Sequence, residues 1–249
     1  MILDNPYNTL AFIYDKWIKG DYSYKKVEEF YIDFIVNNNF DNIVELGIGT
    51  GRISLKLAKE FNKKIIGIDN SDEMLDILNK KIVKYKLTNK FIIKNQDMLN
   101  FKLDFLSNII ILPFRTIGHF NTNDRLKLFK NIYNNLQENG TFIFDHYILD
   151  KNWAEKNNNR LIKMYENDEI KIFDKYQFDF KNSFLIAQVF KQQNNNLQKI
   201  SSFKFYWFDP NEIKSIIQKV GFKIETIYGD FNKNILSKKS SEQIWILRK

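Results

Sequence analysis

The stretch Asn42–Ser71, NIVELGIGTGRISLKLAKEFNKKIIGIDNS, decides the fold. Residues 42–46 are apolar enough to form a buried strand. An amphipathic helix to about residue 61 and a second strand over residues 64–68 follow, and the stretch then reaches Asp69. The turn before the helix contains three glycines, Gly47, Gly49 and Gly51. This order predicts a β-α-β unit and therefore a parallel α/β sheet.

The turn offers a ligand a surface of bare peptide. Glycine has no Cβ, so the chain can take positive φ angles and pass close to a ligand. The N–H groups that open the helix lack intrahelical partners and attract a carboxylate or phosphate. Asp69 follows about 20 residues after the turn, where a carboxylate accepts hydrogen bonds from ribose hydroxyls. These features indicate an adenosine-bearing ligand.

The spacing of the glycines separates two classes of adenosine ligand. Dinucleotide-binding turns have the pattern G-x-G-x-x-G/A, whereas here the glycines alternate and Glu45 stands two residues before the first of them. A carboxylate at that position repels a pyrophosphate but binds an ammonium group. The ligand should therefore carry a cationic amine beside its ribose; a tight turn without a ligand is the alternative.

The motif ELGIGTGR (residues 45–52), followed by GIDNS (residues 67–71) and Met74, resembles the first two motifs of the class I S-adenosylmethionine-dependent methyltransferases. The resemblance implies S-adenosyl-L-methionine as cofactor. It also implies a Rossmann-like doubly wound sheet of seven strands with an antiparallel last strand. On this basis the cofactor-binding candidates are Glu45, Gly47, Gly49, Gly51, Asp69, Met74, Asp97, Met98 and Pro113.

Two of these candidates have structural alternatives. Met74 packs either on the adenine ring or in the core, where we also expect Leu75. Asp97 follows a third strand, residues 91–94. It either accepts a hydrogen bond from the adenine amino group, with the Met98 N–H donating to the ring, or caps the next turn.

The methyl acceptor should bind beyond the apolar strand of residues 107–113, because open α/β sheets bind ligands at the carboxyl ends of their strands. Small-molecule N- and O-methyltransferases, including those acting on amino sugars, show a similar stretch with a histidine at the position of His119. Its unperturbed pKa near 6.5 would let it act as a base at neutral pH; a structural histidine is the alternative. Arg115 is a candidate acceptor contact, although many such enzymes carry Asn there.

Residues 1–24 are rich in aromatic side chains and resemble the family segment that folds over cofactor and substrate. We expect Tyr14 to lie near the sulfonium as a second catalytic candidate. Phe12 and Trp17 fit equally well as side chains buried against the core.

A fifth strand over residues 141–147 should follow a helix that ends with Gly140 in the left-handed conformation. Asp145 and His146 lie at the end of this strand, and only one can face the acceptor because side chains alternate. We assign His146 to the acceptor side. Residues 151–205 predict an antiparallel β-rich insertion covering the acceptor site.

The chain then returns to the core, which comprises residues 1–150 and 206–249. Asp209, Pro210 and Glu212 predict a capping box at the start of a helix. Two final strands should form a terminal hairpin typical of the methyltransferases.

The composition of the chain limits the expected location of the protein in the cell and the kinds of molecule that it is expected to bind. The 249 residues contain no long apolar run and no signal-peptide pattern, so we expect a cytoplasmic protein. Without cysteine there are no disulfides and no thiolate metal ligands, and we expect no metal site. The net charge of +8 comes from scattered lysines. Because the lysines are scattered, they favour a solvated surface over a nucleic-acid-binding patch. The positive charge can still attract a phosphorylated or carboxylated substrate. The sequence leaves the oligomeric state open.

We therefore expect methyl transfer to nitrogen or oxygen of a small molecule by direct in-line displacement. Methylation of RNA, DNA or protein is an alternative, although Leu112-Pro113-Phe114-Arg115 differs from the Asn/Asp-Pro-Pro-Tyr/Phe motif used on nucleobases. A non-catalytic protein that binds S-adenosylmethionine is a third possibility.

Overall fold

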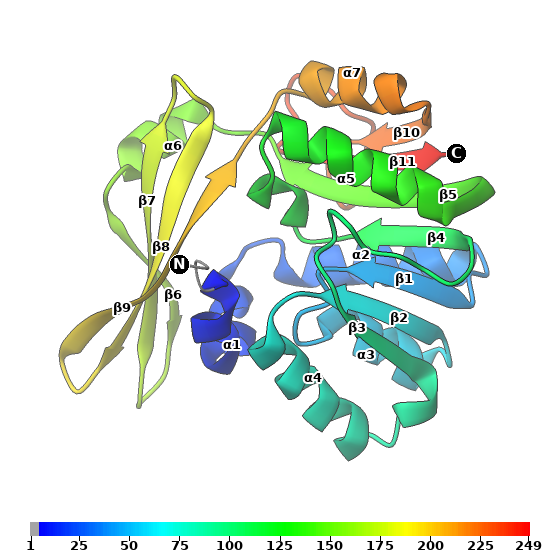
Figure 1. Ribbon diagram of the computed structural model, residues 1–249. Coiled ribbons are helices and arrows are strands. Elements are labelled where there is room, and N and C mark those ends of the chain that lie inside the picture. The colour runs from blue at the N-terminus through cyan, green and yellow to red at the C-terminus, as the bar shows by residue number, and fades with distance from the viewer. Residues whose placement is uncertain (1–4) are drawn as a thin grey trace.

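A seven-stranded mixed sheet forms the centre of the protein in the computed structural model, which describes residues 5–249 (Figure 1). The strand order is β10-β11-β5-β4-β1-β2-β3. β11 runs antiparallel to both of its neighbours, β5 and β10. The strands are β1 Asn42–Leu46, β2 Lys64–Asp69, β3 Phe91–Asn95, β4 Ser107–Leu112, β5 Leu136–Tyr147, β10 Lys223–Tyr228 and β11 Glu242–Arg248. The predicted fold class is confirmed; the first four residues of the predicted core lie outside the described part.

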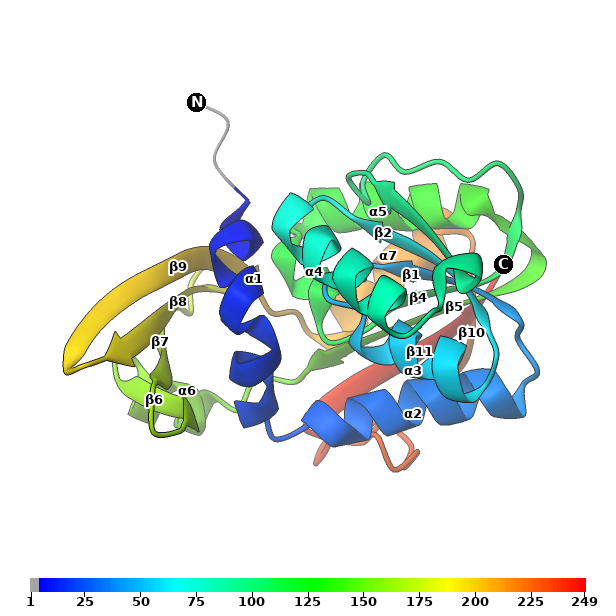
Figure 2. The same ribbon diagram turned by 90° about the horizontal axis from the view of Figure 1, so that it is seen from below.

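Helices cover both faces of this sheet (Figure 2). One face packs against α2 (Tyr24–Asn37), α3 (Arg52–Glu60) and α4 (Asp72–Lys84). The other packs against α5 (Thr122–Asn135) and α7 (Pro210–Val220). Alternate strand residues feed the two cores, which is why the central strands are apolar without interruption.

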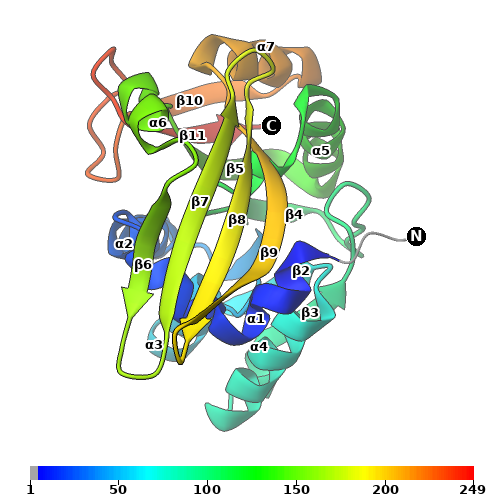
Figure 3. The same cartoon turned by 90° about the vertical axis from the view of Figure 1, so that its left-hand side faces the viewer.

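The predicted insertion is a separate four-stranded antiparallel sheet in the order β6-β7-β8-β9 (Figure 3). Its elements are α6 Lys151–Asn157, β6 Leu161–Glu166, β7 Lys171–Asp179, β8 Phe184–Gln193 and β9 Asn196–Tyr206. Helix α6 was not predicted, because its sequence KNWAEKN buries only Ala154 and so lacks an apolar stripe. Asn194 and Asn195, both at positive φ, form the two-residue tip between β8 and β9.

Helix α1 (Pro6–Trp17) lies between the small sheet and the α/β core (Figure 1). Its residues Leu10 and Ile13 share an apolar cluster with Ile172 and Val189 of the small sheet. Phe12 is 61% exposed, so its expected burial is wrong. The short 3-10 helices are η1 Ile18–Gly20, η2 Thr88–Lys90 and η3 Thr116–His119.

Two local predictions are corrected by the structure. Asn139, not Gly140, has the positive φ at the turn after α5. Gly140 already belongs to β5, where a Cβ would approach the Gln137 carbonyl oxygen to 2.8 Å. The capping box at α7 is also incomplete, because the Glu212 carboxylate accepts a hydrogen bond from Thr122 Oγ1 at 3.0 Å instead of folding back to the helix start.

In the part of the chain that the structure describes, no helix is long and apolar enough to cross a membrane. Across residues 5–249 we also find no group of three His, Cys, Asp or Glu side chains placed to hold a metal ion.

The cap of α7 gives a test of the local structure. Asp209 accepts a hydrogen bond from Asn211 N at 2.7 Å, so Asp209→Ala should lower the free energy of unfolding by about 1 kcal/mol. Lys214→Gln serves as the control, because this exposed side chain of the same helix takes no part in the cap. Urea unfolding measures both; equal losses would contradict this assignment.

Candidate active site

The glycine turn after β1 is fixed by hydrogen bonds to the end of β2. Gly47 N and Ile48 N both donate to the Ile68 carbonyl oxygen, at 2.8 and 3.2 Å. Gly49 N donates to Asp69 Oδ2 at 2.8 Å. All three predicted glycines have positive φ, at +69°, +52° and +81° for Gly47, Gly49 and Gly51. The turn therefore needs glycine for its backbone conformation.

The three glycines face different surroundings. A Cβ on Gly51 would lie 2.4 Å from Leu78 Cδ1, so this glycine allows α4 to pack. A Cβ on Gly47 would lie 3.0 Å from Thr116 Cγ2 and 3.5 Å from Met98 Cε. A Cβ on Gly49 would meet nothing nearer than the Gly47 carbonyl oxygen at 4.0 Å. The peptide at Gly49 is thus an open cradle, as a ligand lying on bare backbone requires.

Asp69 keeps acceptor capacity for a ligand. Its carboxylate accepts from Gly49 N at 2.8 Å and from Ser71 N at 3.0 Å. Burial raises the pKa of Asp69, and these backbone N–H groups partly oppose the rise. Because a carboxylate can accept about four hydrogen bonds, the position remains compatible with ribose hydroxyls.

Glu45 is a buried carboxyl group on the same side. Its side chain accepts a hydrogen bond from Ser54 Oγ, and the residue is only 3% exposed. Burial raises the pKa of Glu45 to about 7, and the nearby negative charge of Asp69 adds to the effect. A cationic ligand would offset the cost of ionising the buried Glu45. The two carboxyl groups, Glu45 and Asp69, therefore fit a nucleoside with an amino-acid tail.

The adenine-side candidates lie near the same edge. Met74 is 1% exposed, and its N–H donates to Ser71 Oγ, the cap of α4. Asp97 is exposed and accepts from Leu99 N at 2.9 Å, so it caps the turn after β3. Met98 lies beside Gly47, as described above. Their contacts with adenine stay predictions.

Helix α1 covers this edge through polar contacts. Ser71 Oγ donates to Asn8 Oδ1 at 2.7 Å. Asp15 accepts from Thr50 Oγ1 at 2.6 Å and forms an ion pair with Lys81 at 2.6 Å. These contacts join α1 to the glycine turn and to α4, and sequence reasoning did not identify Asn8 or Asp15. The pair Asn5-Pro6, an N-cap followed by proline, was the available signal for this helix.

His119 ends η3 and lies in an aromatic environment. Its Nε2 is 2.8 Å from the Tyr7 hydroxyl, and its ring centroid is 5.4 Å from Phe203 and 5.0 Å from Phe205. Burial lowers the pKa of His119 to about 4, although a hydrogen bond to the Lys204 backbone partly opposes this. The expectation of an ordinary pKa is therefore wrong, and His119 is neutral across pH 6–9.

Tyr14 lies near the charged groups of the site. Its ring packs edge-on against Tyr7 at 6.1 Å and Trp17 at 5.8 Å between centroids. Burial raises the pKa of Tyr14, with Arg52 opposing the rise and Asp69 adding to it. The hydroxyl is thus neutral at physiological pH and close enough to Asp69 to sense its charge.

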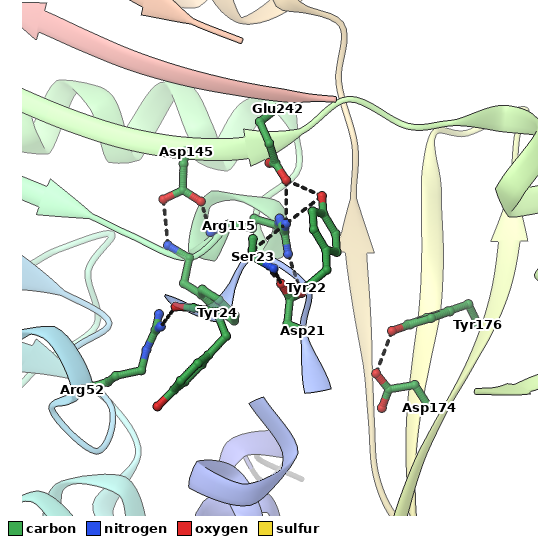
Figure 4. A network of polar contacts seen from close by, with 11 residues as sticks. Asp21, Tyr22, Ser23, Tyr24, Arg52, Arg115, Asp145, Asp174, Tyr176 and Glu242 are labelled. Carbon is green, nitrogen blue, oxygen red and sulfur yellow. Dashed lines mark hydrogen bonds and ion pairs between the residues drawn. The ribbon is translucent and has the colours of Figure 1, made fainter. Parts of the chain in front are cut away.

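Pro113 and Arg115 lie after the end of β4. The Arg115 side chain lies beside Asp21 and Ser23, just before the start of α2 (Figure 4). The Pro113 carbonyl oxygen accepts from Thr116 Oγ1 at 2.7 Å. The Arg115 guanidinium pairs with Asp21 at 2.7 Å and Glu242 at 2.8 Å. Burial alone would lower the pKa of Arg115, but these two carboxylates raise it overall. Arg115 therefore joins the α1–α2 link to β11, and this geometry does not support the predicted acceptor contact.

Asp145 and His146 point to opposite sides of β5, as strand alternation requires. Asp145 accepts from Phe114 N at 2.8 Å, Arg115 N at 2.9 Å and Tyr31 Oη at 2.7 Å. His146 stacks on Phe208, with ring centroids 4.4 Å apart, and is fully buried. An acceptor can contact His146 only if the aromatic side chains around it move.

Comparison with known proteins supports this geometry. Residues 43–140 match the family described as methyltransferase domain. The carboxy-S-adenosyl-L-methionine synthase of Nautilia profundicola is 31% identical over 145 residues, which are 57% of this chain and 59% of that protein. The chain thus spans about three fifths of that relative's length.

Solved structures share the fold over nearly the whole chain. A S-adenosylmethionine-dependent methyltransferase from Clostridium acetobutylicum superposes with a TM-score of 0.80 at 24% identity, covering 98% of this chain and 99% of the other. Residues 43–140 thus match the methyltransferase domain in sequence, and the chain shares the fold of S-adenosylmethionine-dependent methyltransferases. CalS10, an amino pentose methyltransferase from Micromonospora echinaspora, superposes with a TM-score of 0.68 at 10% identity over 95% and 96% of the two chains. At these identities the structural likeness concerns the fold.

Glu45 makes the stability of the ligand-free protein depend on pH. Because its pKa is raised from 4.5 to about 7, the carboxyl group stays protonated in the folded state while it ionises in the unfolded state. The associated stability is full below about pH 4.5 and is lost as the pH rises to about 7, by roughly 1–3 kcal/mol. Urea unfolding at pH 5 and pH 8 should show a smaller pH effect in Glu45→Gln than in the wild type. Equal pH effects in the two proteins would contradict the assignment.

Proposed function

We propose that this protein transfers the methyl group of S-adenosyl-L-methionine to a nitrogen or oxygen atom of a small-molecule acceptor. The observation that carries this proposal is the open peptide at Gly49 between the buried carboxyl group of Glu45 and the half-buried carboxylate of Asp69. Bare backbone admits the nucleoside, Asp69 suits its ribose, and Glu45 suits its ammonium group. The match to the methyltransferase domain over residues 43–140 supports the same activity.

When bound, the cofactor supplies a methyl group already activated by the sulfonium. The protein then needs to align the acceptor and exclude water, and such orientation lowers a barrier by roughly 7–11 kcal/mol in the best intramolecular cases. Helix α1 suits this role, because its contacts through Asn8 and Asp15 close the glycine edge against solvent. Tyr14 on the same helix remains our candidate for a positioning group.

We assign proton removal to His119 together with Tyr7. The neutral imidazole can accept a proton, and its Nε2 is already in contact with the Tyr7 hydroxyl. We propose that the acceptor gives its proton to the Tyr7 oxygen while Tyr7 passes its own proton to Nε2. Because the pKa of His119 is about 4, the imidazole does not change its charge between pH 6 and 9. If His119 is the base, turnover should not depend on its ionisation over that range.

The acceptor class is drawn from the surroundings of the site and from the neighbours. CalS10 is described as an amino pentose methyltransferase, which favours a sugar-like acceptor here. The small sheet lies beside the proposed acceptor edge (Figure 3), and its Phe203 and Phe205 rings contact His119. We keep the cytoplasm as the predicted location.

Titration calorimetry with S-adenosylmethionine and S-adenosylhomocysteine tests the proposal. Both should bind the wild type, and Asp69→Ala should bind at least about tenfold more weakly, because charge-assisted hydrogen bonds contribute about 1.5–3 kcal/mol. Asp72→Ala removes a carboxylate three residues away and serves as the control. Binding of a nicotinamide dinucleotide in place of these compounds would reject the proposal.

A panel of amino sugars and small amines is first screened for an acceptor by measuring the formation of S-adenosylhomocysteine. The same assay with that acceptor then tests the proton-transfer pair, His119 and Tyr7. His119→Ala should lower turnover by about 10²-fold or more while cofactor affinity stays unchanged. Tyr7→Phe, which keeps the ring and removes the hydroxyl, should lower turnover in the same direction. Wild-type turnover in both variants would exclude this pair from proton transfer.

A further inference from the structure

A cavity of about 290 Å³ lies where the small sheet meets the start of α5. Three segments line it: the start of α5, the turn between β7 and β8, and the link from β9 to α7. Its lining includes Arg125, Glu212, Asn121, Thr122, Asn182 and Trp207. The lining combines polar side chains with the aromatic rings of Tyr206 and Trp207, and none of the residues predicted to bind the cofactor belongs to it.

Arg125 is the buried cation of this cavity. The residue is 1% exposed, and its guanidinium lies 4.0 Å from the centroid of the Phe208 ring. Nη1 is 3.4 Å from Glu212. Within residues 5–249, Nε and Nη2 have no hydrogen-bond partner. A buried charged donor without a partner is costly, so a group that accepts from these two nitrogens would stabilise the protein.

Side chains near Arg125 also have buried polar atoms without hydrogen-bond partners. Eight buried polar side-chain atoms lack a partner in the described part of the chain, and five of them belong to Arg125, His146 and Tyr147. His146 and Arg125 both pack on Phe208. Burial lowers the pKa of His146, and the positive charge of Arg125 lowers it further. His146 is therefore neutral, and the charge of the cluster comes from Arg125.

The remaining charges near the cavity already have partners. Glu212 accepts from Thr122 Oγ1 at 3.0 Å, and Asp124 accepts from Asn121 Nδ2 at 2.7 Å. Arg115, the other buried arginine, is paired with Asp21 and Glu242. Arg115 lacks a partner at Nε alone, whereas Arg125 lacks partners at both Nε and Nη2, which form one edge of its guanidinium. A guanidinium edge of this kind matches a carboxylate or phosphate, which accept two parallel hydrogen bonds.

Three packed aromatic side chains, Phe205, His146 and Phe208, connect the proposed reaction site at His119 to Arg125. Phe205 lies with its ring centroid 5.0 Å from His119 and 5.6 Å from His146. The next residue, Tyr206, lines the cavity. A ligand that spans both places would present one end to His119 and its other end to Arg125.

We propose that the methyl acceptor carries a carboxylate or phosphate group and that the Nε–Nη2 edge of Arg125 binds this group. The inference rests on the proposed function in that the ligand is the methyl acceptor. The Tyr147 hydroxyl also lacks a partner and lies close enough to Arg125 to influence its pKa, so it is available as a further donor in the same cluster. Glu212 limits the affinity, because its carboxylate lies beside the bound anion.

Titration calorimetry with inorganic phosphate and with acetate tests the anion site. The wild type should bind at least one of them saturably, and Arg125→Gln should bind it about 10–100-fold more weakly. Lys127→Gln removes an exposed charge from the same helix and should match the wild type within about twofold. Glu212→Gln should bind more tightly, because it removes a like charge. No saturable binding by the wild type, or unchanged binding by Arg125→Gln, would overturn the inference.

Thermal unfolding separates a ligand-binding arginine from a structural one. Arg125→Gln should leave the unfolding midpoint of the ligand-free protein unchanged or higher, because it removes a buried charge with two unpartnered nitrogens and only a long contact to the half-exposed Glu212. An ion pair important for the fold would instead make Arg125→Gln and Glu212→Gln both less stable. That second result would overturn the proposal.

Turnover distinguishes the acceptor's own anionic group from a free anion. Phosphorylated sugars should be methylated with a lower KM than the parent sugars, and inorganic phosphate should compete with them. An equal KM for each pair would overturn the link to the acceptor.

Cofactor binding is measured separately on the same variants: if phosphate binding depends on Arg125 but S-adenosylmethionine does not bind, the proposed function fails. If the cofactor binds and phosphate does not, only this inference fails.

Discussion

The hydrogen bond from Gly49 N to the Asp69 carboxylate is the constraint on which the site depends. It joins the turn after β1 to the end of β2, and it forms only because Gly49 can take a φ of +52°. The same carboxylate accepts from Ser71 N and so also fixes the approach to α4. One side chain thereby positions both peptide segments that a nucleoside would touch. Without it, the glycine turn would be joined to the end of β2 only by the N–H groups of Gly47 and Ile48, which donate to the Ile68 carbonyl oxygen.

The surroundings of the site contain ionisable groups in unfavourable environments. Burial raises the pKa of Glu45 to about 7 and those of Asp145 and Asp174 to about 6. Such perturbed groups concentrate at functional sites because selection there acts on chemistry before stability. Asp174 illustrates how the cost is limited, since Tyr176 Oη donates to it at 2.6 Å (Figure 4) and Trp17 Nε1 donates to it at 2.7 Å. The contact from Trp17 also holds α1 against the small sheet.

The sequence predicted what is encoded locally. Glycine spacing, uninterrupted apolar strands and Asp69 at a strand end identified the β-α-β unit, and the terminal hairpin completed the sheet. Contacts between distant segments could not be predicted: Tyr7 meets His119 across 112 residues, and Arg115 meets Glu242 across 127. The same limit explains the error in the pKa of His119, because its burial depends on Phe203 and Phe205 of the small sheet. Arg125 looked like an ordinary helix residue until its burial was visible.

Hydrogen–deuterium exchange on addition of S-adenosylhomocysteine tests the central claim most directly, because it reports on the backbone amides of the segments that the nucleoside would cover. The account predicts slower exchange at Gly47–Gly51, at Asp97 and Met98, and in α1, with no change at the Asn194–Asn195 tip of the small sheet. Unchanged exchange in the glycine turn, with protection confined to other parts of the chain, would contradict the account.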